Sequence, residues 1–176
     1  FISKAYSSKV MKPRVCICIP SAVTGIEENA VVDAAVSAGA RQVFLIEEPI
    51  AAAIGAGLDI MKANGNMIVD IGGGTTDIAV ITMGCISISR SIRVAGNTLD
   101  EAIVRQIRRE RDVIIGDKTG EYIKKQIGCS FLRDVELGLT VKGKHFITNM
   151  PVSIEVSSTE AYLAMRPHLE TIAETI

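Results

Sequence analysis

Three consecutive glycines followed by two threonines, Gly72 to Thr76, form the segment of this chain best suited to bind phosphate. Apolar β-branched residues on both sides of the segment predict a β-hairpin with the glycines at its turn. Glycines permit left-handed backbone conformations and leave no Cβ above the backbone, so successive N–H groups can face an anion. The hydroxyls of Thr75 and Thr76 add donors beside it. The alternative is a tight turn whose glycines serve the backbone geometry alone.

Asp70 stands where the first strand of this hairpin ends. A carboxylate there can hold a magnesium ion through water molecules, because magnesium gives up its hydration shell reluctantly. The segment matches neither of the common nucleotide loops. The chain contains no GxxxxGK[ST] sequence, and the spacing of Gly72, Gly73 and Gly74 does not fit GxGxxG at a helix start.

Glu48 is a second candidate for chemistry, because it follows a short apolar strand. Open α/β sheets place ligands at the carboxyl ends of their strands. A carboxylate there can orient or deprotonate a water that attacks a terminal phosphate. Local spacing alone favours a simpler interpretation, in which Glu47 and Glu48 complement the dipole of the following helix.

The first half of the chain alternates strands and helices. We expect a continuous apolar strand over residues 14–19, covered on both faces, and a helix over residues 24–38 with Thr24 and Glu27 as a capping box. A second strand over residues 43–46 leads through Pro49 into a helix ending near residue 56. With the glycine hairpin, this order predicts an α/β layer with a partly parallel sheet.

The sequence pattern of the second half of the chain predicts a compact α+β insertion. After a strand over residues 86–94, we expect a helix over residues 99–111 capped by Thr98 and Glu101, with a solvated basic face, and a helix over residues 120–127. A strand over residues 135–141 with a turn at residues 142–144 and a strand over residues 151–156 follow. We expect the final helix to be capped by Ser157 or Ser158 together with Glu160.

Composition excludes several classes of function. The 176 residues are 48% hydrophobic and 4% aromatic, which predicts a core of Ile, Val, Ala and Leu. With a net charge of -1, the chain has no overall positive potential that would attract nucleic acid or anionic lipid. No apolar run is long enough to span a bilayer, and the given sequence does not open with a signal-peptide pattern. Neither end looks natural, since Phe1 is no initiator and residues 1–12 resemble the tail of a helix and a loop. We therefore expect a fragment.

The four cysteines include no CxxC pair. Cys16 and Cys18 alternate with Ile17 and Ile19, which places both sulfurs on one face of a strand. Reduced, buried thiols are the expected state in a cytosolic protein, and His145 and His168 supply no obvious metal partners.

Four segments together resemble the MreB-type bacterial actins. DIGGGTTDIAV at residues 70–80 resembles the second phosphate-binding hairpin of the actin, sugar-kinase and heat-shock-chaperone ATPase superfamily. The segments at residues 18–35, 46–58 and 91–103 narrow the resemblance to MreB-type proteins, the cytoplasmic bacterial filament proteins that set rod shape. The likeness runs from about residue 15 to residue 156. It implies the α/β fold of an actin-like ATPase (ribonuclease H-like), here the lower subdomain with a small α+β insertion.

The resemblance implies a role for each matching residue. The backbone amides of Gly72, Gly73, Gly74 and Thr75 would cradle the β- and γ-phosphates of ATP, with Asp70 beside Mg²⁺. Glu48 matches the glutamate that positions the hydrolytic water, which overrides the local interpretation of its spacing, and Thr76 would assist that water. Gly96 would approach the ribose and phosphates, while Glu121 and Lys124 would flank the adenosine.

The resemblance also implies a division of the chain. Residues 1–95 and 158–176 would form part of the large lower subdomain, and residues 96–157 the small upper one. The first phosphate loop and the glycine-rich adenosine loop of the family are absent, so we expect this chain alone to bind nucleotide weakly. Asp77 stands where Glu is usual, a mild change outside the cradle, and Gly120 stands where Ala is common.

The function implied is an ATP-binding filament protein that organises cell-wall synthesis. Its partners would be further copies of itself and the cell-wall elongation machinery, with no nucleic acid. The full-length protein would be a weak ATPase whose filaments are membrane-associated, although we expect no membrane contact from this fragment. The alternatives are a chaperone-type or sugar-kinase-type ATPase of the same superfamily, or a structural module without activity of its own.

Overall fold

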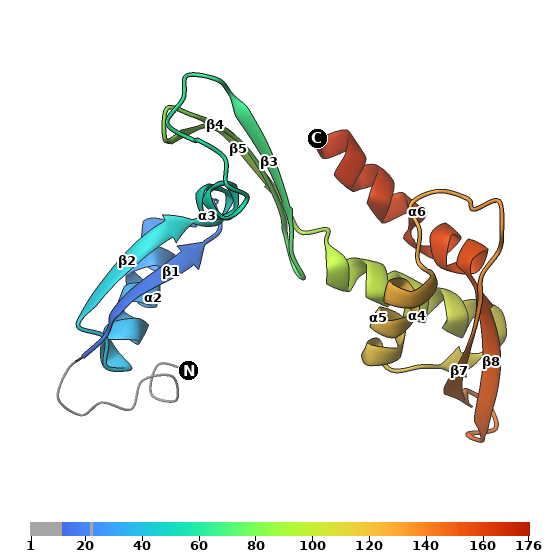
Figure 1. Ribbon diagram of the computed structural model, residues 1–176. Coiled ribbons are helices and arrows are strands. Elements are labelled where there is room, and N and C mark those ends of the chain that lie inside the picture. The colour runs from blue at the N-terminus through green and yellow to red at the C-terminus, as the bar shows by residue number, and fades with distance from the viewer. Residues whose placement is uncertain (1–11, 22) are drawn as a thin grey trace. The chain divides into compact units, whose positions relative to one another are not determined.

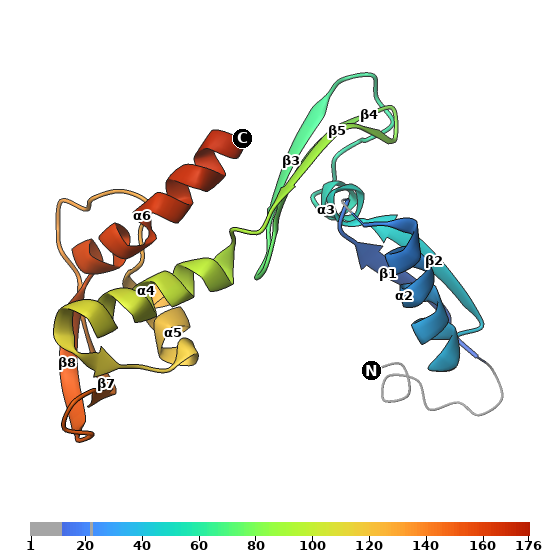
Figure 2. The same ribbon diagram turned by 180° about the vertical axis from the view of Figure 1, so that it is seen from behind.

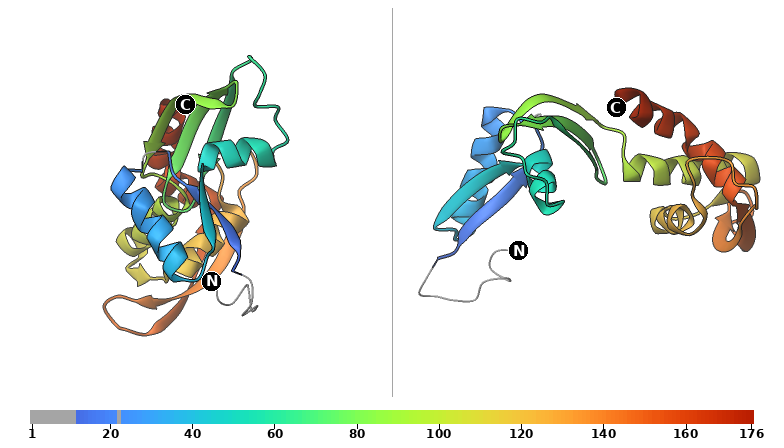
Figure 3. Two further views of the ribbon diagram at one scale, coloured as in Figure 1. Left: turned by 90° about the vertical axis from the view of Figure 1, so that its left-hand side faces the viewer. Right: turned by 45° about the horizontal axis from the view of Figure 1, so that its top comes forward.

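The computed structural model describes residues 12–21 and 23–176, so the predicted helix tail and loop of residues 1–11 lie outside the described residues. The chain forms two compact units. The first holds the described residues up to Asp70 together with Asp77–Ser91, and the second holds Ile71–Thr76 and Ile92–Ile176. Figure 3 shows the elements of each unit from two further sides. None of the described helices is both long and apolar enough to cross a membrane.

A parallel strand pair opens the first unit. Strand β1 (Arg14–Ile19) pairs with β2 (Gln42–Glu47), with Val15 opposite Val43. Helix α2 (Gly25–Ser37) covers one face of this pair, as Figures 1 and 2 show from opposite sides. The predicted capping box is confirmed, since Thr24 and Glu27 exchange side-chain and backbone hydrogen bonds. Helix α3 (Glu48–Gly55) begins directly at the end of β2, with Pro49 in its first turn.

Both cysteines of β1 lie on one face, as predicted, but they are exposed rather than buried. Their register partners in β2 are Phe44 and Ile46, and Phe44 is itself 40% exposed. The expectation of a strand covered on both faces is therefore wrong, because α2 covers only the opposite face in the described part of the chain.

The glycine hairpin belongs to a separate three-stranded sheet. Strands β3 (Asn66–Ile71), β4 (Thr76–Thr82) and β5 (Cys85–Ile92) lie in sequence order and are joined by short turns, so neighbours run antiparallel. The predicted hairpin is confirmed. The predicted single sheet is not, because β1 and β2 pair only with each other among the described strands.

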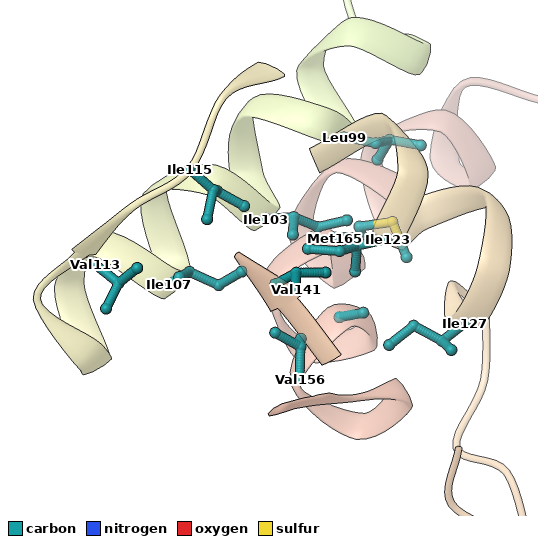
Figure 4. Packing of buried hydrophobic residues seen from close by; sticks show 11 residues of the cluster. Leu99, Ile103, Ile107, Val113, Ile115, Ile123, Ile127, Val141, Val156 and Met165 are labelled. Atoms are coloured by element: carbon teal, nitrogen blue, oxygen red, sulfur yellow. The ribbon is translucent and has the colours of Figure 1, made fainter. Parts of the chain in front are cut away.

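The second unit combines helices with an antiparallel sheet. Helix α4 (Gly96–Arg111) is followed by β6 (Val113–Ile114) and α5 (Asp117–Ile127). Strands β7 (Gly138–His145) and β8 (Pro151–Ser157) complete the sheet in the order β6–β7–β8, and α6 (Ser158–Thr175) closes the chain. Figure 4 shows the core between these elements, with Ile103, Ile107, Ile123, Val141, Val156 and Met165 pointing toward one another.

Several boundaries of this unit differ from the prediction: α5 begins at Asp117 rather than at residue 120, and β7 begins at Gly138 rather than at residue 135. Two further differences have a clear physical reason. Strand β7 continues through residues 142–144 to His145, so Gly143 is no turn residue. A Cβ on Gly143 would lie 2.5 Å from Val113 Cγ1 and 2.9 Å from the Ile114 carbonyl oxygen. Glycine is required there because β6 approaches so closely. Helix α4 begins at Gly96 with no side-chain cap, so the capping role expected for Thr98 and Glu101 is wrong.

The final helix begins as predicted. The Ser157 hydroxyl accepts a hydrogen bond from the Glu160 N–H, and the Glu160 carboxylate accepts one from the Ser157 N–H, which completes a capping box. Helix α6 packs against α4 and α5 in the second unit. The division into large and small subdomains at residues 95 and 158 stays a prediction.

Candidate functional site

The glycine turn is held in place by the start of α4. The Gly72 N–H donates to the Thr75 carbonyl oxygen at 2.9 Å, which closes the turn between β3 and β4. The Gly96 N–H donates to the Gly72 carbonyl at 3.1 Å, and the Asn97 N–H donates to the Gly73 carbonyl at 2.8 Å. The first N–H groups of a helix have no partner within the helix. Here the turn supplies their acceptors, which explains why α4 has no side-chain cap.

This arrangement turns two glycine amides outward. In a trans peptide the C=O of one residue and the N–H of the next point in opposite directions, and the described residues contain no cis peptide. Since the carbonyls of Gly72 and Gly73 face α4, the N–H groups of Gly73 and Gly74 face away from it. Within the described part of the chain, the N–H groups of Gly73, Gly74 and Thr75 have no acceptor. Gly73 and Gly74 are exposed, so these donors are available to an anion.

Gly72 and Gly73 serve close approach rather than unusual backbone angles, whereas a Cβ on Gly74 would meet nothing within 4 Å. None of the three has φ in the left-handed region, so the expectation that they adopt left-handed backbone conformations is wrong. A Cβ on Gly73 would lie 3.3 Å from the Asn97 Oδ1, and one on Gly96 would lie 3.2 Å from the Gly72 carbonyl oxygen. Gly96 thus belongs to the site because it lets α4 reach the turn.

Thr76 ties the same turn to the segment before α4. Its side chain is fully buried, and its hydroxyl donates to the Val94 carbonyl at 2.7 Å. The hydroxyl oxygen still has lone pairs that can accept a hydrogen bond from water. The catalytic role expected for Thr76 stays a prediction.

Lys124 links α5 to the start of α4. Its Nζ donates to the Gly96 carbonyl oxygen at 2.8 Å and forms an ion pair with Asp100 Oδ1 at 2.8 Å. Both side chains are largely buried, with exposed fractions of 22% for Lys124 and 13% for Asp100. Lys124 therefore fixes the position of Gly96, and through it the glycine turn.

Glu121 lies one turn before Lys124 on α5 and is more exposed. Its carboxylate pairs with Lys125 Nζ at 2.5 Å, and this hydrogen bond lowers the pKa of Glu121. The pair is a surface i,i+4 contact that a ligand can displace at small cost. The contact of Glu121 and Lys124 with adenosine stays a prediction.

Three carboxylates lie near one another in the first unit. Burial raises the pKa of Glu48, and the negative charges of Asp77 and Asp70 raise it further. Asp77 is 2% exposed, and its Oδ1 has no hydrogen-bond partner in the described part of the chain. An unpaired buried carboxylate oxygen beside two other acids fits a cation near these side chains.

Asp77 is the residue that the sequence interpretation undervalued. The Gly72–Thr75 pair sets a register that, continued down the hairpin, places Asp70 opposite Asp77. The symmetry of the two aspartates about the turn is visible in DIGGGTTD and is the signal that identifies Asp77. Its negative charge acts on Glu48, while its interpretation as a mild change outside the cradle stays a prediction.

The three carboxylates of Asp70, Glu48 and Asp77 are suited to bind magnesium only through water molecules. Among the described residues, no three His, Cys, Asp or Glu side chains are placed to hold a metal ion directly. Magnesium usually keeps several of its waters and binds proteins through one or two carboxylates. Asp70, Glu48 and Asp77 thus suit a hydrated ion rather than a fully protein-ligated one.

Replacing Glu48 with Gln tests this electrostatic arrangement. Because folding raises the pKa of Glu48, it favours the protonated form. The stability from this preference is complete below about pH 4 and is lost as pH rises through the folded pKa. At pH 7 and without metal, Glu48→Gln should therefore raise the melting temperature by a few degrees, and near pH 4 the difference should vanish. Thermal melts at both pH values check this.

Asp77→Asn provides the matched control for that variant. With the Asp77 charge removed, Glu48→Gln should stabilise the chain less at pH 7 than it does in the parent. An equal gain in both backgrounds would show that Asp77 does not act on Glu48.

Comparisons with known proteins give a consistent result. The family model described as MreB/Mbl protein matches residues 1–176. The cell shape-determining protein MreB of Escherichia coli K12 is 41% identical over 178 residues, covering 100% of this chain and 51% of that protein. The cell shape-determining protein Mbl of Bacillus subtilis is 42% identical, covering 93% of this chain and 49% of that protein. The chain thus spans about half the length of these curated relatives.

Solved structures agree with the sequence comparisons. MreB5 of Spiroplasma citri bound to AMPPNP superposes with a TM-score of 0.88 at 37% identity, covering 96% of this chain and 52% of that one. A structure of the same MreB5 is bound to ADP. The MamK double helical filament gives a TM-score of 0.81 at 18% identity, covering 99% of this chain and 51% of that one, which shows a shared fold.

Proposed function

The chain belongs to the MreB/Mbl family, and from this we propose that it supplies a nucleotide-binding part of an actin-like filament protein that determines rod cell shape. The relatives from Escherichia coli and Bacillus subtilis are cell shape-determining proteins, and MreB5 of Spiroplasma citri was solved bound to AMPPNP. The observation that carries the proposal is the pair of outward-facing amides at Gly73 and Gly74, held by the start of α4. The alternative of a chaperone or sugar kinase has no such support from the relatives.

In this proposal the glycine turn binds the β- and γ-phosphates of ATP. The N–H groups of Gly73, Gly74 and Thr75 donate to phosphate oxygens, and Gly72 keeps the turn closed through its bond to Thr75. Gly96 holds the turn at α4, and Glu121 and Lys124 lie on the adenosine side along α5. Hydrogen bonds from amides to charged phosphates are about twice as strong as those between neutral groups.

In this proposal the carboxylates of Asp70 and Glu48 bind the magnesium ion and the attacking water, respectively. Asp70 holds Mg²⁺ through water, and the ion, when bound, neutralises negative charge on the phosphates. Glu48 orients the water that attacks the terminal phosphate and accepts its proton, with Thr76 accepting a hydrogen bond from the same water. The raised pKa of Glu48 supports this role, because a general base works best when its pKa lies near the working pH. The activity of the whole protein is a weak ATPase coupled to filament turnover.

The partners we propose are further copies of the protein and the cell-wall elongation machinery, in a bacterial cell. The fold shared with the MamK double helical filament supports filament formation in this proposal. A head-to-tail contact that does not close on itself generates such a filament.

Calorimetric titration of this chain with Mg-ATP and Mg-AMP tests the phosphate assignment. We expect the chain to bind Mg-ATP with a Kd well above about 1 μM, because it carries one wall of the site. Mg-ATP should still bind at least about tenfold more tightly than Mg-AMP, since the turn contacts phosphates that AMP lacks. Equal affinities would contradict the assignment. Micromolar binding would show that the chain alone forms a complete site.

A further inference from the structure

A groove between helices α4 and α6 lies apart from the glycine turn. It has a volume of about 400 Å³, and both of its walls belong to the second unit. Arg105 lies more than two helical turns after Gly96, roughly 13 Å further along α4. The side chains that give this surface, the α4–α6 groove, its chemistry are Arg105 and Arg109 of α4 and Leu163, Pro167 and His168 of α6.

Positive charge lines the α4 wall of the groove. The Arg105 side chain is exposed and forms no ion pair or hydrogen bond with any other described residue. The Arg109 side chain is 73% exposed; it donates to the Gln106 side chain, and its Nη2 lies 3.6 Å from Glu110 Oε1. A guanidinium has five N–H donors, so most of those of Arg109 stay free. No Asp or Glu of the described chain lines the groove, so these charges can pair with acidic groups of another molecule.

The α6 wall contains a proline inside the helix. Pro167 has no backbone N–H. The carbonyl oxygen of Leu163, one turn earlier, therefore lacks the donor that an α-helix normally provides. The Leu163 side chain is itself 51% exposed. The α6 wall thus offers a ligand an apolar surface and a backbone acceptor.

We propose that the α4–α6 groove binds an acidic, extended peptide segment of a partner protein. Carboxylates of the segment pair with Arg105 and Arg109, an apolar side chain packs on Leu163, and a backbone N–H donates to the Leu163 carbonyl oxygen. Clusters of arginine are a recurring means of binding acidic motifs, and the guanidinium matches a carboxylate with two parallel hydrogen bonds. This contact goes beyond the proposed nucleotide function and requires no nucleotide.

The two walls favour a peptide over a simple anion. Successive side chains of an extended chain point to opposite sides, so acidic residues can face α4 while apolar residues face α6. The N–H groups of an extended chain are also free to donate, whereas those inside a helix are already paired. A small anion would leave the apolar surface of Leu163 uncovered and would gain nothing from a carbonyl oxygen, which accepts hydrogen bonds and donates none.

Fluorescence anisotropy with a labelled peptide of alternating glutamate and leucine tests this proposal. Without nucleotide the peptide should bind the chain saturably, and a peptide with glutamine in place of glutamate should bind at least about tenfold more weakly. Arg105→Gln combined with Arg109→Gln should weaken binding by a similar factor, with an unchanged melting temperature because both side chains are exposed. Lys142→Gln combined with Lys144→Gln is the matched control, since it removes the same charge from exposed positions of β7 and should leave binding unchanged.

Pro167→Ala separates the backbone contact from the charges. Alanine supplies the missing N–H to the Leu163 carbonyl oxygen, so the variant should melt at a higher temperature and yet bind the peptide several-fold more weakly. Binding as tight as that of the parent chain would contradict the backbone contact.

Three further results would overturn the proposal. The first is peptide binding that the arginine and lysine variants weaken equally. The second is a single-stranded oligonucleotide of the same charge that binds as tightly as the peptide, which would indicate a general attraction for anions. The third is self-association without peptide that Arg105→Gln combined with Arg109→Gln abolishes, measured by analytical ultracentrifugation, which would assign the groove to a contact between copies of the chain.

Discussion

Gly143→Ala should destabilise the second unit by about 3 kcal/mol. The added Cβ would lie 2.5 Å from Val113 Cγ1, 2.9 Å from the Ile114 carbonyl oxygen and 3.0 Å from Ile115 Cγ2. Val113 and Ile115 are buried in the core cluster, so neither can move aside without opening it. The strand must therefore shift, which breaks the pairing of β6 with β7.

Tyrosine fluorescence during chemical unfolding measures this effect. Two of the chain's three tyrosines, Tyr122 and Tyr162, lie in α5 and α6 of the second unit. The matched control is Gly116→Ala, where a Cβ meets open space, and its cost should stay below about 1 kcal/mol. If Gly143→Ala unfolds at the same denaturant concentration as Gly116→Ala, then β6 does not approach β7 as closely as described.

Lys124→Met should be the second large effect, a loss of about 2 kcal/mol. The substitution keeps most of the side-chain volume but removes the charge that faces Asp100, whose side chain is 13% exposed, and the donor to the Gly96 carbonyl. Removing one partner of a fully buried ion pair costs about 3–5 kcal/mol, and the partial exposure of Lys124 reduces that figure. We also expect weaker nucleotide binding, because Gly96 holds the glycine turn.

The neighbouring lysine offers a control of the same type. Lys125→Met removes the exposed pair with Glu121 and should change stability by less than about 0.5 kcal/mol. The double variant Lys124→Met with Asp100→Asn should be more stable than the sum of the two single changes predicts. Strict additivity would mean that the two side chains do not interact.

The sequence correctly predicted those elements that depend on residues close together in the chain. The capping boxes at Thr24 and Ser157 and the hairpin around the glycines depend on residues a few positions apart, and the structure confirms all three. The candidate site itself depends on contacts between residues that are far apart in the sequence. The glycine turn serves as the cap of α4, more than twenty residues later, and only the folded chain shows that Gly72 and Gly73 accept its first hydrogen bonds.

The wrong predictions have the same origin. The sequence Lys-Gly-Lys around Gly143 is typical of a turn. In the structure, however, glycine is needed at position 143 because β6 lies too close to leave room for a Cβ. Thr98 and Glu101 fit a capping box, yet the helix starts two residues before Thr98, at Gly96, because the turn satisfies its N–H groups.

The most direct test of the phosphate cradle follows the backbone amides themselves. In a nuclear magnetic resonance titration of the isotope-labelled chain with magnesium and AMPPNP, the amide signals of Gly73, Gly74 and Thr75 should shift most and saturate together. Large shifts elsewhere in the chain, with these three signals unmoved at saturation, would show that the phosphates bind somewhere other than the glycine turn.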